Sequence, residues 1–276
     1  MRTSGSGLAD ETMSGEAAPS PPEPPFVVSQ RFFASLIGVV ALGLPAVLLA
    51  VSVARGCFHD SLSHHYFTRI TGDAFVIALA MIGLFLFAYR GRDACENLLA
   101  GIAGIAAISI AAFPTNGAGH LDPVCVGRGF FDPADGAAEI TDAGTNGPSF
   151  VLFEGVDVVH FGSAAVLFGF LAWYALFNFT RIHDPRSLGP DGRPTVTKRR
   201  RNRIYRAAGA TIIACMVALG GYTAFGSAPT GGEARWMFWN GYNVTFWLEA
   251  VALVAFGIAW IVRGRAFDRM LLDEDV

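Results

Sequence analysis

Six stretches of the chain carry almost no charge over the length of a membrane crossing. They run over Phe32–Ala54, Ala74–Tyr89, Leu98–Phe113, Val158–Phe179, Ala207–Phe225 and Val244–Val262. A helix that crosses the hydrocarbon core needs roughly 17 to 25 apolar residues, so each stretch predicts one transmembrane helix, with the two shortest gaining a little at their ends. The pattern therefore predicts an all-α fold, a polytopic membrane bundle of six transmembrane helices.

The second and third stretches are rich in small residues, as the segment GIAGIAAISIAA shows. Small residues let helix backbones approach closely inside a membrane bundle. The charged segment between the two stretches, YRGRDACEN, must reach water. We therefore interpret this region as a hairpin of two full spans, although burial of both segments between other helices is the alternative.

The polar segments divide the chain around these spans. Residues 1–31 are rich in Pro and Ser and predict a disordered cytoplasmic tail that is not removed. Residues 32–264 form the predicted transmembrane domain, which includes an extracytoplasmic loop at 114–157 and a basic cytoplasmic loop at 181–206. The long loop is either functional or a disordered insertion. Residues 265–276 are predicted to be a cytoplasmic C-terminal tail.

The distribution of Lys and Arg predicts the orientation. Of the 20 Lys and Arg, only Arg55, Arg69, Arg128 and Arg235 fall on the side opposite the N-terminus. Because cytoplasmic loops carry an excess of Lys and Arg, both termini are predicted to be cytoplasmic (N-in/C-in). An odd number of spans would break this alternation. We expect a multi-pass protein of a bacterial inner (cell) membrane.

Composition supports the membrane interpretation and narrows the partners. The chain has 276 residues, of which 53% are hydrophobic and 16% charged, and its mean hydropathy is +0.44. Soluble domains carry about 25% charged residues. A net charge of −3 argues against a generally basic nucleic-acid binder. The run KRRRNRIYR beside the fifth stretch sets topology and contacts anionic lipid, so the expected partner is the bilayer, with protein partners left open.

Ionisable residues that fall in or beside the spans gather at the outer side. Glu249 lies about one and a half turns into the sixth stretch, and Asp157 and His160 open the fourth. His64 and His65 precede the second stretch and are consecutive, so one at most is expected to be a ligand. Such groups are costly in a span unless they pair or bind a cation. Imidazoles with carboxylates predict a divalent-metal site, with zinc preferred by the nitrogen ligands.

Other interpretations of these residues stay open. Asp73, at the start of the second stretch, is a candidate catalytic base or a cap of its helix, and Asp157 has the same alternative. Glu249 could instead form a hydrogen bond to Tyr222, Asn243 or a histidine. No HExxH, GxSxG or Walker pattern is present. Cys57 and Cys125 both fall outside and could form a disulfide, whereas the two remaining cysteines, Cys95 and Cys215, are expected to stay free.

Three segments resemble a family of bacterial multi-span membrane proteins. They are SLSHHYFTRITGDAFVIALAMIGLFLFAYRG followed by IAAFPT, then RNRIYRAAG, and finally FWLEAVALVAFGIAWIVRG. The resemblance covers most of the chain from about Phe32 to Gly264. It implies the multi-span architecture, singles out Asp73 and Glu249, and implies no activity. His64 and His65 stand where the family tends to have smaller or aromatic residues, which weakens a histidine-based mechanism.

A fainter resemblance, carried by the spacing from Ser61 to His65 and by Asp73, is to membrane hydrolases of the alkaline-ceramidase type. These proteins place Ser, Asp and His residues around zinc in a seven-helix bundle. The HxxxH motif of their final helix is absent here, and one helix is missing. The resemblance implies a zinc-dependent hydrolase as an alternative function.

Two hypotheses of different classes follow, and the sequence leaves open whether the protein is an enzyme. The first is a non-enzymatic integral membrane protein with a structural, sensory or accessory role. The second is a metal-dependent hydrolase of lipid-like substrates at the outer leaflet. A third, proton-coupled transport, has the least support because the inner halves of the spans offer few polar groups besides Asn178.

Overall fold

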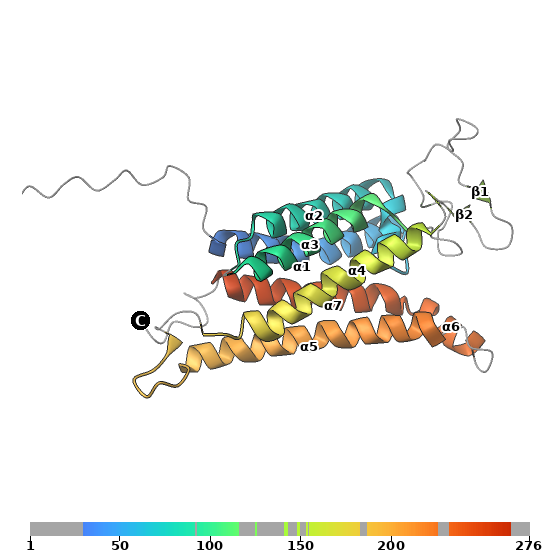
Figure 1. The fold of residues 1–276 in the computed structure, drawn as a ribbon. Helices are drawn as coiled ribbons and strands as arrows, with labels where there is room; N and C mark the ends of the chain where they lie inside the picture. Colours follow the sequence, from blue (N-terminus) through green and yellow to red (C-terminus); the bar gives the residue numbers. More distant parts are fainter. Residues whose placement is uncertain are drawn as a thin grey trace, which may run out of the picture.

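A computed structural model provides the fold, in which the described residues form six long helices and several shorter elements (Figure 1). It describes residues 30–91, 93–115, 125, 141–142, 148–149, 153, 155–182, 187–225 and 232–265. Most of the predicted tail at 1–31, of the loop at 114–157 and of the tail at 265–276 lies outside these residues. The long helices are α1 (Gln30–Arg55), α2 (Arg69–Ala88), α3 (Ala94–Ala112), α4 (Val156–Trp173), α5 (Val196–Phe225) and α7 (Val244–Gly264).

Five shorter elements complete the described structure. A 3₁₀ helix, η1 (Ser63–Phe67), precedes α2, and one π-helical turn, η3 (Tyr174–Asn178), continues α4. Helix α6 (Gly232–Gly241) precedes α7. The two-residue strands β1 (Thr141–Asp142) and β2 (Pro148–Ser149) pair antiparallel.

The prediction of an all-α fold with six candidate spans is confirmed. Six helices of the described chain are long and apolar enough to cross a membrane. Their outer faces carry large apolar side chains, such as Val53, Ile77, Leu84, Val158 and Val217, which are more than half exposed. Exposed apolar side chains in this number are costly in water, and a lipid bilayer covers them on all sides of a bundle.

The structure differs from the sequence prediction at several helix ends. Helix α2 begins at Arg69 rather than Ala74, and α5 begins at Val196 rather than Ala207. The basic run in α5 is therefore helical, because Lys and Arg are good helix formers and their charge only keeps this part of the helix near water. Helix α6, a segment with three aromatic residues, was not predicted as a separate element.

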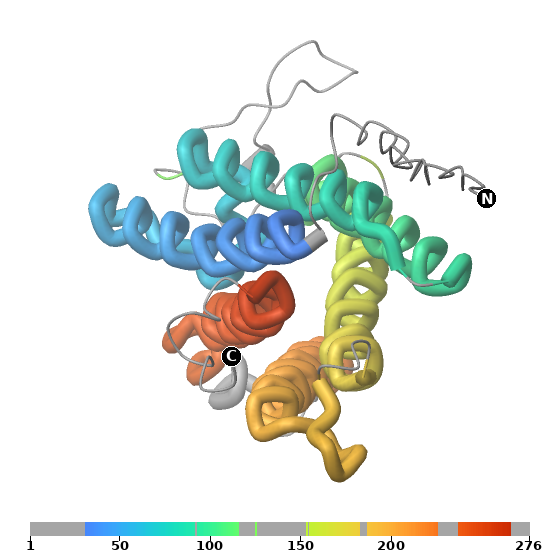
Figure 2. Tube along the Cα trace, turned by 90° about the vertical axis from the view of Figure 1, so that its left-hand side faces the viewer, coloured from blue at the N-terminus to red at the C-terminus, as the bar shows by residue number. Residues whose placement is uncertain are grey.

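The six long helices form a closed ring. Each packs against its neighbour in the order α1, α2, α3, α4, α5, α7, and α7 packs against α1 (Figure 2). Aromatic side chains fill the centre near one end of the ring, where Tyr174 lies in contact with Tyr89, Phe179 and Trp260. The ring of Trp260 is 1% exposed and Tyr174 is fully buried. The centre at this level is therefore packed with side chains.

Two pairs of glycines allow neighbouring helices to come close. A Cβ atom on Gly38 of α1 would lie 2.7 Å from the carbonyl oxygen of Gly257 in α7, and the reverse distance is 2.9 Å. Gly83 of α2 and Gly104 of α3 face each other in the same way, at 2.9 Å in both directions. The small residues noted in the second and third stretches thus serve close helix packing.

The bundle has two chemically different ends. The disulfide end, named for the bond between Cys57 and Cys125, comprises the C-terminus of α1, the 56–68 loop with η1, and the N-termini of α4 and α7. The arginine end comprises the opposite helix ends, and Arg31, Arg90, Lys198 and Arg263 lie there. The predicted acids and histidines near the spans belong to the disulfide end.

Candidate functional site

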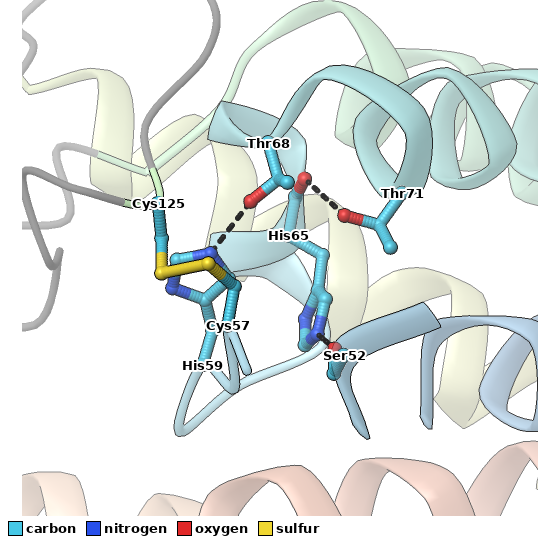
Figure 3. The surroundings of a disulfide bond; sticks show 7 residues. All are labelled: Ser52, Cys57, His59, His65, Thr68, Thr71 and Cys125. Atoms are coloured by element: carbon cyan, nitrogen blue, oxygen red, sulfur yellow. Dashed lines mark hydrogen bonds between the residues drawn. A yellow bond between two sulfur atoms is a disulfide. The ribbon is translucent and has the colours of Figure 1, made fainter. Parts of the chain in front are cut away.

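The loop between α1 and α2 builds the polar cluster at the disulfide end. The chain leaves α1 through Gly56, whose φ of +68° favours glycine. Cys57 then forms a disulfide with Cys125, which joins this loop to the segment after α3 (Figure 3). Cys95 and Cys215 are free cysteines. The loop ends in η1, where Ser63, His65, Tyr66 and Phe67 are buried.

Glu249 of α7 holds this loop from the opposite side. The Ser61 hydroxyl donates to Glu249 Oε2 at 2.8 Å, and the backbone N–H of Leu62 donates to the same oxygen at 2.7 Å. One turn earlier in α7, the N–H of Phe246 donates to the carbonyl oxygen of Asp60 at 2.7 Å. Glu249 therefore interacts with the loop through hydroxyl and amide donors, and not through the Tyr222, Asn243 or histidine side chains considered from the sequence.

His65 is fully buried at the centre of the cluster. The Ser52 hydroxyl lies 2.9 Å from His65 Nε2, and the carbonyl oxygen of Ser61 lies 2.9 Å from Nδ1. A carbonyl only accepts, so Nδ1 carries the proton and Nε2 accepts from Ser52. Burial lowers the pKa of His65 to about 4, and the neighbouring His59 adds to this lowering. The imidazole is therefore neutral at pH 7.

His160 of α4 makes a similar arrangement with different partners. Its Nδ1 lies 2.8 Å from the carbonyl oxygen of Phe113, and its Nε2 lies 2.9 Å from the hydroxyl of Ser63. By the same reasoning Nδ1–H donates to Phe113 and Nε2 accepts from Ser63. His160 is 1% exposed. One side chain thus links α4 to the end of α3 and to η1.

The other two histidines of the loop are also engaged. His59 Nε2 lies 2.6 Å from the Thr68 hydroxyl, and His64 Nδ1 lies 2.6 Å from Asp60 Oδ1 (Figure 3 shows the former). His59 and His65 meet edge to face with ring centroids 5.0 Å apart. A short range of sequence therefore supplies three imidazoles, each held by a different oxygen.

The structure brings most of the sequence-predicted residues to one end but gives them separate partners. Glu249, His64, His65 and His160 each bond to a different protein group, as described above. Asp157, in the first turn of α4, lies close enough for its charge to act on His160. Among the described residues, no group of three or more His, Cys, Asp or Glu side chains is arranged to hold a metal ion. A zinc or other metal site stays a prediction.

Asp73 differs from the buried residues of this cluster in its exposure. Its side chain is exposed on α2, in the second turn of a helix that begins at Arg69. It is therefore not in the first turn, where it was expected as a cap. The neighbouring Gly72 packs against the carbonyl of Tyr66, so a Cβ atom at this position would collide with η1. Glycine here allows α2 to approach the loop.

Sequence reasoning missed the hydroxyl partners of the histidines. Ser52 lies inside an apolar stretch and is 1% exposed, and Ser63 is 8% exposed. A serine within a span is common and gives little signal alone. Six polar residues besides Tyr66 in the eight positions from His59 to Tyr66 were the available signal, because a loop buried with so many polar groups must pair them.

A second buried carboxylate lies at the arginine end. Glu96 of α3 is 3% exposed, and Asn178 of η3 donates to its Oε1 at 2.5 Å. Arg181 Nη1 lies 3.6 Å from the same oxygen. Asp93 caps α3 by accepting from the N–H of Glu96 at 2.8 Å. The polar Asn178 in the fourth span is therefore part of a link between α3 and α4.

Comparisons of the chain with protein-family profiles, with curated proteins and with solved structures found no match. The two family resemblances drawn from the sequence stay predictions. What is established is a helical protein with six candidate membrane spans and a hydrogen-bonded polar cluster at one end.

Proposed function

We propose that this protein is a non-catalytic, multi-pass component of a bacterial inner membrane, with an accessory or sensory role and with its arginine end in the cytoplasm. The excess of Lys and Arg in the segments at the arginine end supports this orientation. The disulfide between Cys57 and Cys125 supports it as well, because disulfides persist on the oxidising side of such a membrane.

The observation that carries the non-catalytic role is the pairing of Glu249. Its Oε2 accepts from both Ser61 and Leu62, so the most deeply placed acid of the candidate site fastens a loop to α7. His65 and His160 likewise use both ring nitrogens on protein groups. The Nε2 lone pair of each imidazole therefore accepts from a serine hydroxyl, which a metal ion would have to displace.

Metal content of the detergent-purified protein tests this role. Wild type, Glu249→Gln and His160→Ala would be compared by mass spectrometry after purification without chelators. The proposal expects no stoichiometric metal in any of the three proteins. Stoichiometric zinc in wild type that disappears in both variants would overturn it and favour the metal-dependent hydrolase.

One observation favours a second candidate, a hydrolase of lipid-like esters that uses serine. The Ser63 hydroxyl donates to His160 Nε2, and the carbonyl of Phe113 orients the imidazole through Nδ1. This is the arrangement of a nucleophile, its base and an orienting group. Ser63 Oγ would attack an ester carbonyl while His160 takes its proton, and His160 would return the proton to the departing alcohol. Water would then release the acid and restore Ser63.

A fluorophosphonate probe separates the two candidates. The serine-hydrolase candidate expects covalent labelling of wild type, lost in Ser63→Ala. Ser52→Ala is the matched control, because Ser52 also donates to a histidine, but to His65. The non-catalytic proposal expects no labelling of any of the three proteins. Labelling of wild type that disappears only in Ser63→Ala would overturn the non-catalytic proposal in favour of the serine hydrolase.

A further inference from the structure

A cavity of about 290 Å³ opens at the arginine end of the bundle. Residues from the ends of α1, α2, α5 and α7 line it, so it lies where four helix termini converge (Figure 1, left-hand side). Its volume is close to the lower limit of the roughly 300 to 1,000 Å³ that is typical of small-ligand pockets. The cavity is separate from the polar cluster at the disulfide end.

The lining of this cavity is strongly basic. Six of its side chains are cationic, namely Arg31, Arg90, Lys198, Arg201, Arg263 and Arg265. None of the described residues that line it is acidic, and the polar remainder consists of Tyr89, Tyr205 and Ser187. Positive charge gathered around a concave, partly dry site focuses the electrostatic potential there.

Protein contacts hold two of these cations in position. Lys198 Nζ donates to the carbonyl oxygens of Phe179 at 3.0 Å and Arg181 at 2.8 Å. The guanidinium carbon of Arg263 lies 5.5 Å from the centre of the Phe179 ring. Both side chains are thus fixed by neutral groups, which orient the charge without neutralising it. A site fixed in this way loses little side-chain entropy on binding.

The crowding of like charge calls for an anion. Lys198 lies within the repulsive field of Arg201, Arg263 and Arg265. Repulsion of this kind is relieved when a compact anion binds between the charges. Arginine guanidinium groups match phosphate oxygens in pairs, which makes phosphate the anion that this set recognises best.

We propose that this basic cavity binds the phosphate group of a phosphomonoester, carried either by a membrane lipid or by a soluble metabolite. A phosphomonoester carries nearly two negative charges at neutral pH, the highest density that a group of this size offers. The cavity is larger than one phosphate requires, so part of the attached organic group fits beside Tyr89 and Tyr205. Its position at helix termini places it at headgroup depth in a bilayer.

The experiment has two arms that separate the sources. In the first, native mass spectrometry measures retention of phosphatidic acid against phosphatidylcholine by the full-length protein. In the second, glycerol 3-phosphate, which has the same headgroup without acyl chains, is titrated against the protein in detergent. Each arm uses wild type, the double variant Arg201→Gln with Arg263→Gln, and a matched control, Arg200→Gln with Arg203→Gln. The control removes equal charge from exposed positions of α5 outside the cavity lining.

We expect wild type to prefer phosphatidic acid or to bind glycerol 3-phosphate, with at least a tenfold weakening in the cavity variant and less than twofold in the control. If the cavity variant loses binding of phosphatidic acid alone, the ligand is a lipid. If it loses binding of glycerol 3-phosphate, the ligand is a soluble phosphomonoester. If the cavity double variant does not fold, Arg90→Gln replaces it in both arms. Arg90 is an exposed residue of the lining, and its replacement should weaken binding about threefold. Equal effects of cavity and control variants, or no phosphate preference in wild type, would overturn the proposal.

Discussion

The two ends of the bundle differ in how the ionisable residues of their main polar clusters are arranged. At the disulfide end, Glu249, His65 and His160 each form hydrogen bonds to hydroxyl or backbone groups of the protein. At the arginine end, six cations surround one cavity whose described lining contains no acid. Polar groups that are satisfied within the protein fasten its parts together. Cations gathered around one cavity make its lining strongly positive, and a low-dielectric surrounding makes the repulsion between them costly.

Removing the disulfide should produce the largest loss and would test whether the disulfide end is mainly structural. Cys57 and Cys125 are 68 residues apart, and closing a loop of that length in the unfolded chain is worth about 4 kcal/mol. Cys57→Ser with Cys125→Ser should lower the free energy of unfolding by this amount in a denaturant titration. Cys95→Ser, at an exposed free cysteine, is the control and should change little. An unchanged stability would mean that the loop is held by its hydrogen bonds alone.

Truncation of Glu249 should have the next largest effect. Glu249→Ala leaves the Leu62 N–H and the Ser61 hydroxyl without their acceptor, which should cost about 3 kcal/mol. Glu249→Gln keeps an oxygen at the same place and should stay within about 1 kcal/mol of wild type. Thermal unfolding of the three proteins in one detergent provides the comparison. Equal losses in both variants would show that the charge of Glu249 matters, and not its role as an acceptor.

Acidification should weaken the disulfide end through His65. The pKa of His65 is about 4 in the folded protein and about 6.5 in an unfolded chain, so the unfolded chain binds the proton more readily between these values. The stability from the neutral imidazole is complete above pH 6.5 and is lost as the pH falls towards 4. From pH 7.5 to 5 the loss should be about 2 kcal/mol. Unfolding midpoints of wild type and His65→Gln, measured across this range, should converge at low pH. Parallel curves would exclude His65 as the source.

Removing a charge at the arginine end should have the smallest effect. Lys198→Met breaks two hydrogen bonds to carbonyl oxygens, but it also relieves repulsion from three arginines. The net change in stability should be within about 1 kcal/mol because the two contributions oppose each other. Chemical denaturation at low and high salt measures it, and the change should become more unfavourable as salt screens the repulsion. A loss of stability as large as that expected for Glu249→Ala would show that Lys198 fastens the fold in the same way as Glu249 does at the other end.

The spans were predictable because a bilayer imposes one strong rule on composition. A segment that crosses it must be apolar over roughly 20 residues, and that pattern is legible without any knowledge of packing. Helix ends were less predictable, as α5 shows, because Lys and Arg extend a helix beyond the apolar region without changing its type. The separate helix α6 was missed because its aromatic residues suit an interfacial segment of any conformation.

The candidate site was predictable only in part. The sequence indicated that Glu249, His160 and the histidines of the 56–68 loop belong to one end, since topology alternates from span to span. It could not indicate that Ser63 would meet His160, because the two residues are 97 positions apart and the contact depends on how α4 packs beside η1. Hydroxyl partners such as Ser52 give no distinct pattern, since a serine in a span resembles any small residue.

The sequence by itself determined which segments are long and apolar enough to cross a membrane and which end collects histidine or arginine. Those properties follow from local composition, through the cost of moving charge into hydrocarbon. The tertiary structure alone decided which polar groups pair and where a cavity remains. Pairing requires atoms from distant helices to meet within about 3 Å, and that geometry arises only when the ring of helices closes. In the folded protein Glu249 accepts hydrogen bonds from Ser61 and Leu62, whereas several arginines line a cavity at the other end of the bundle.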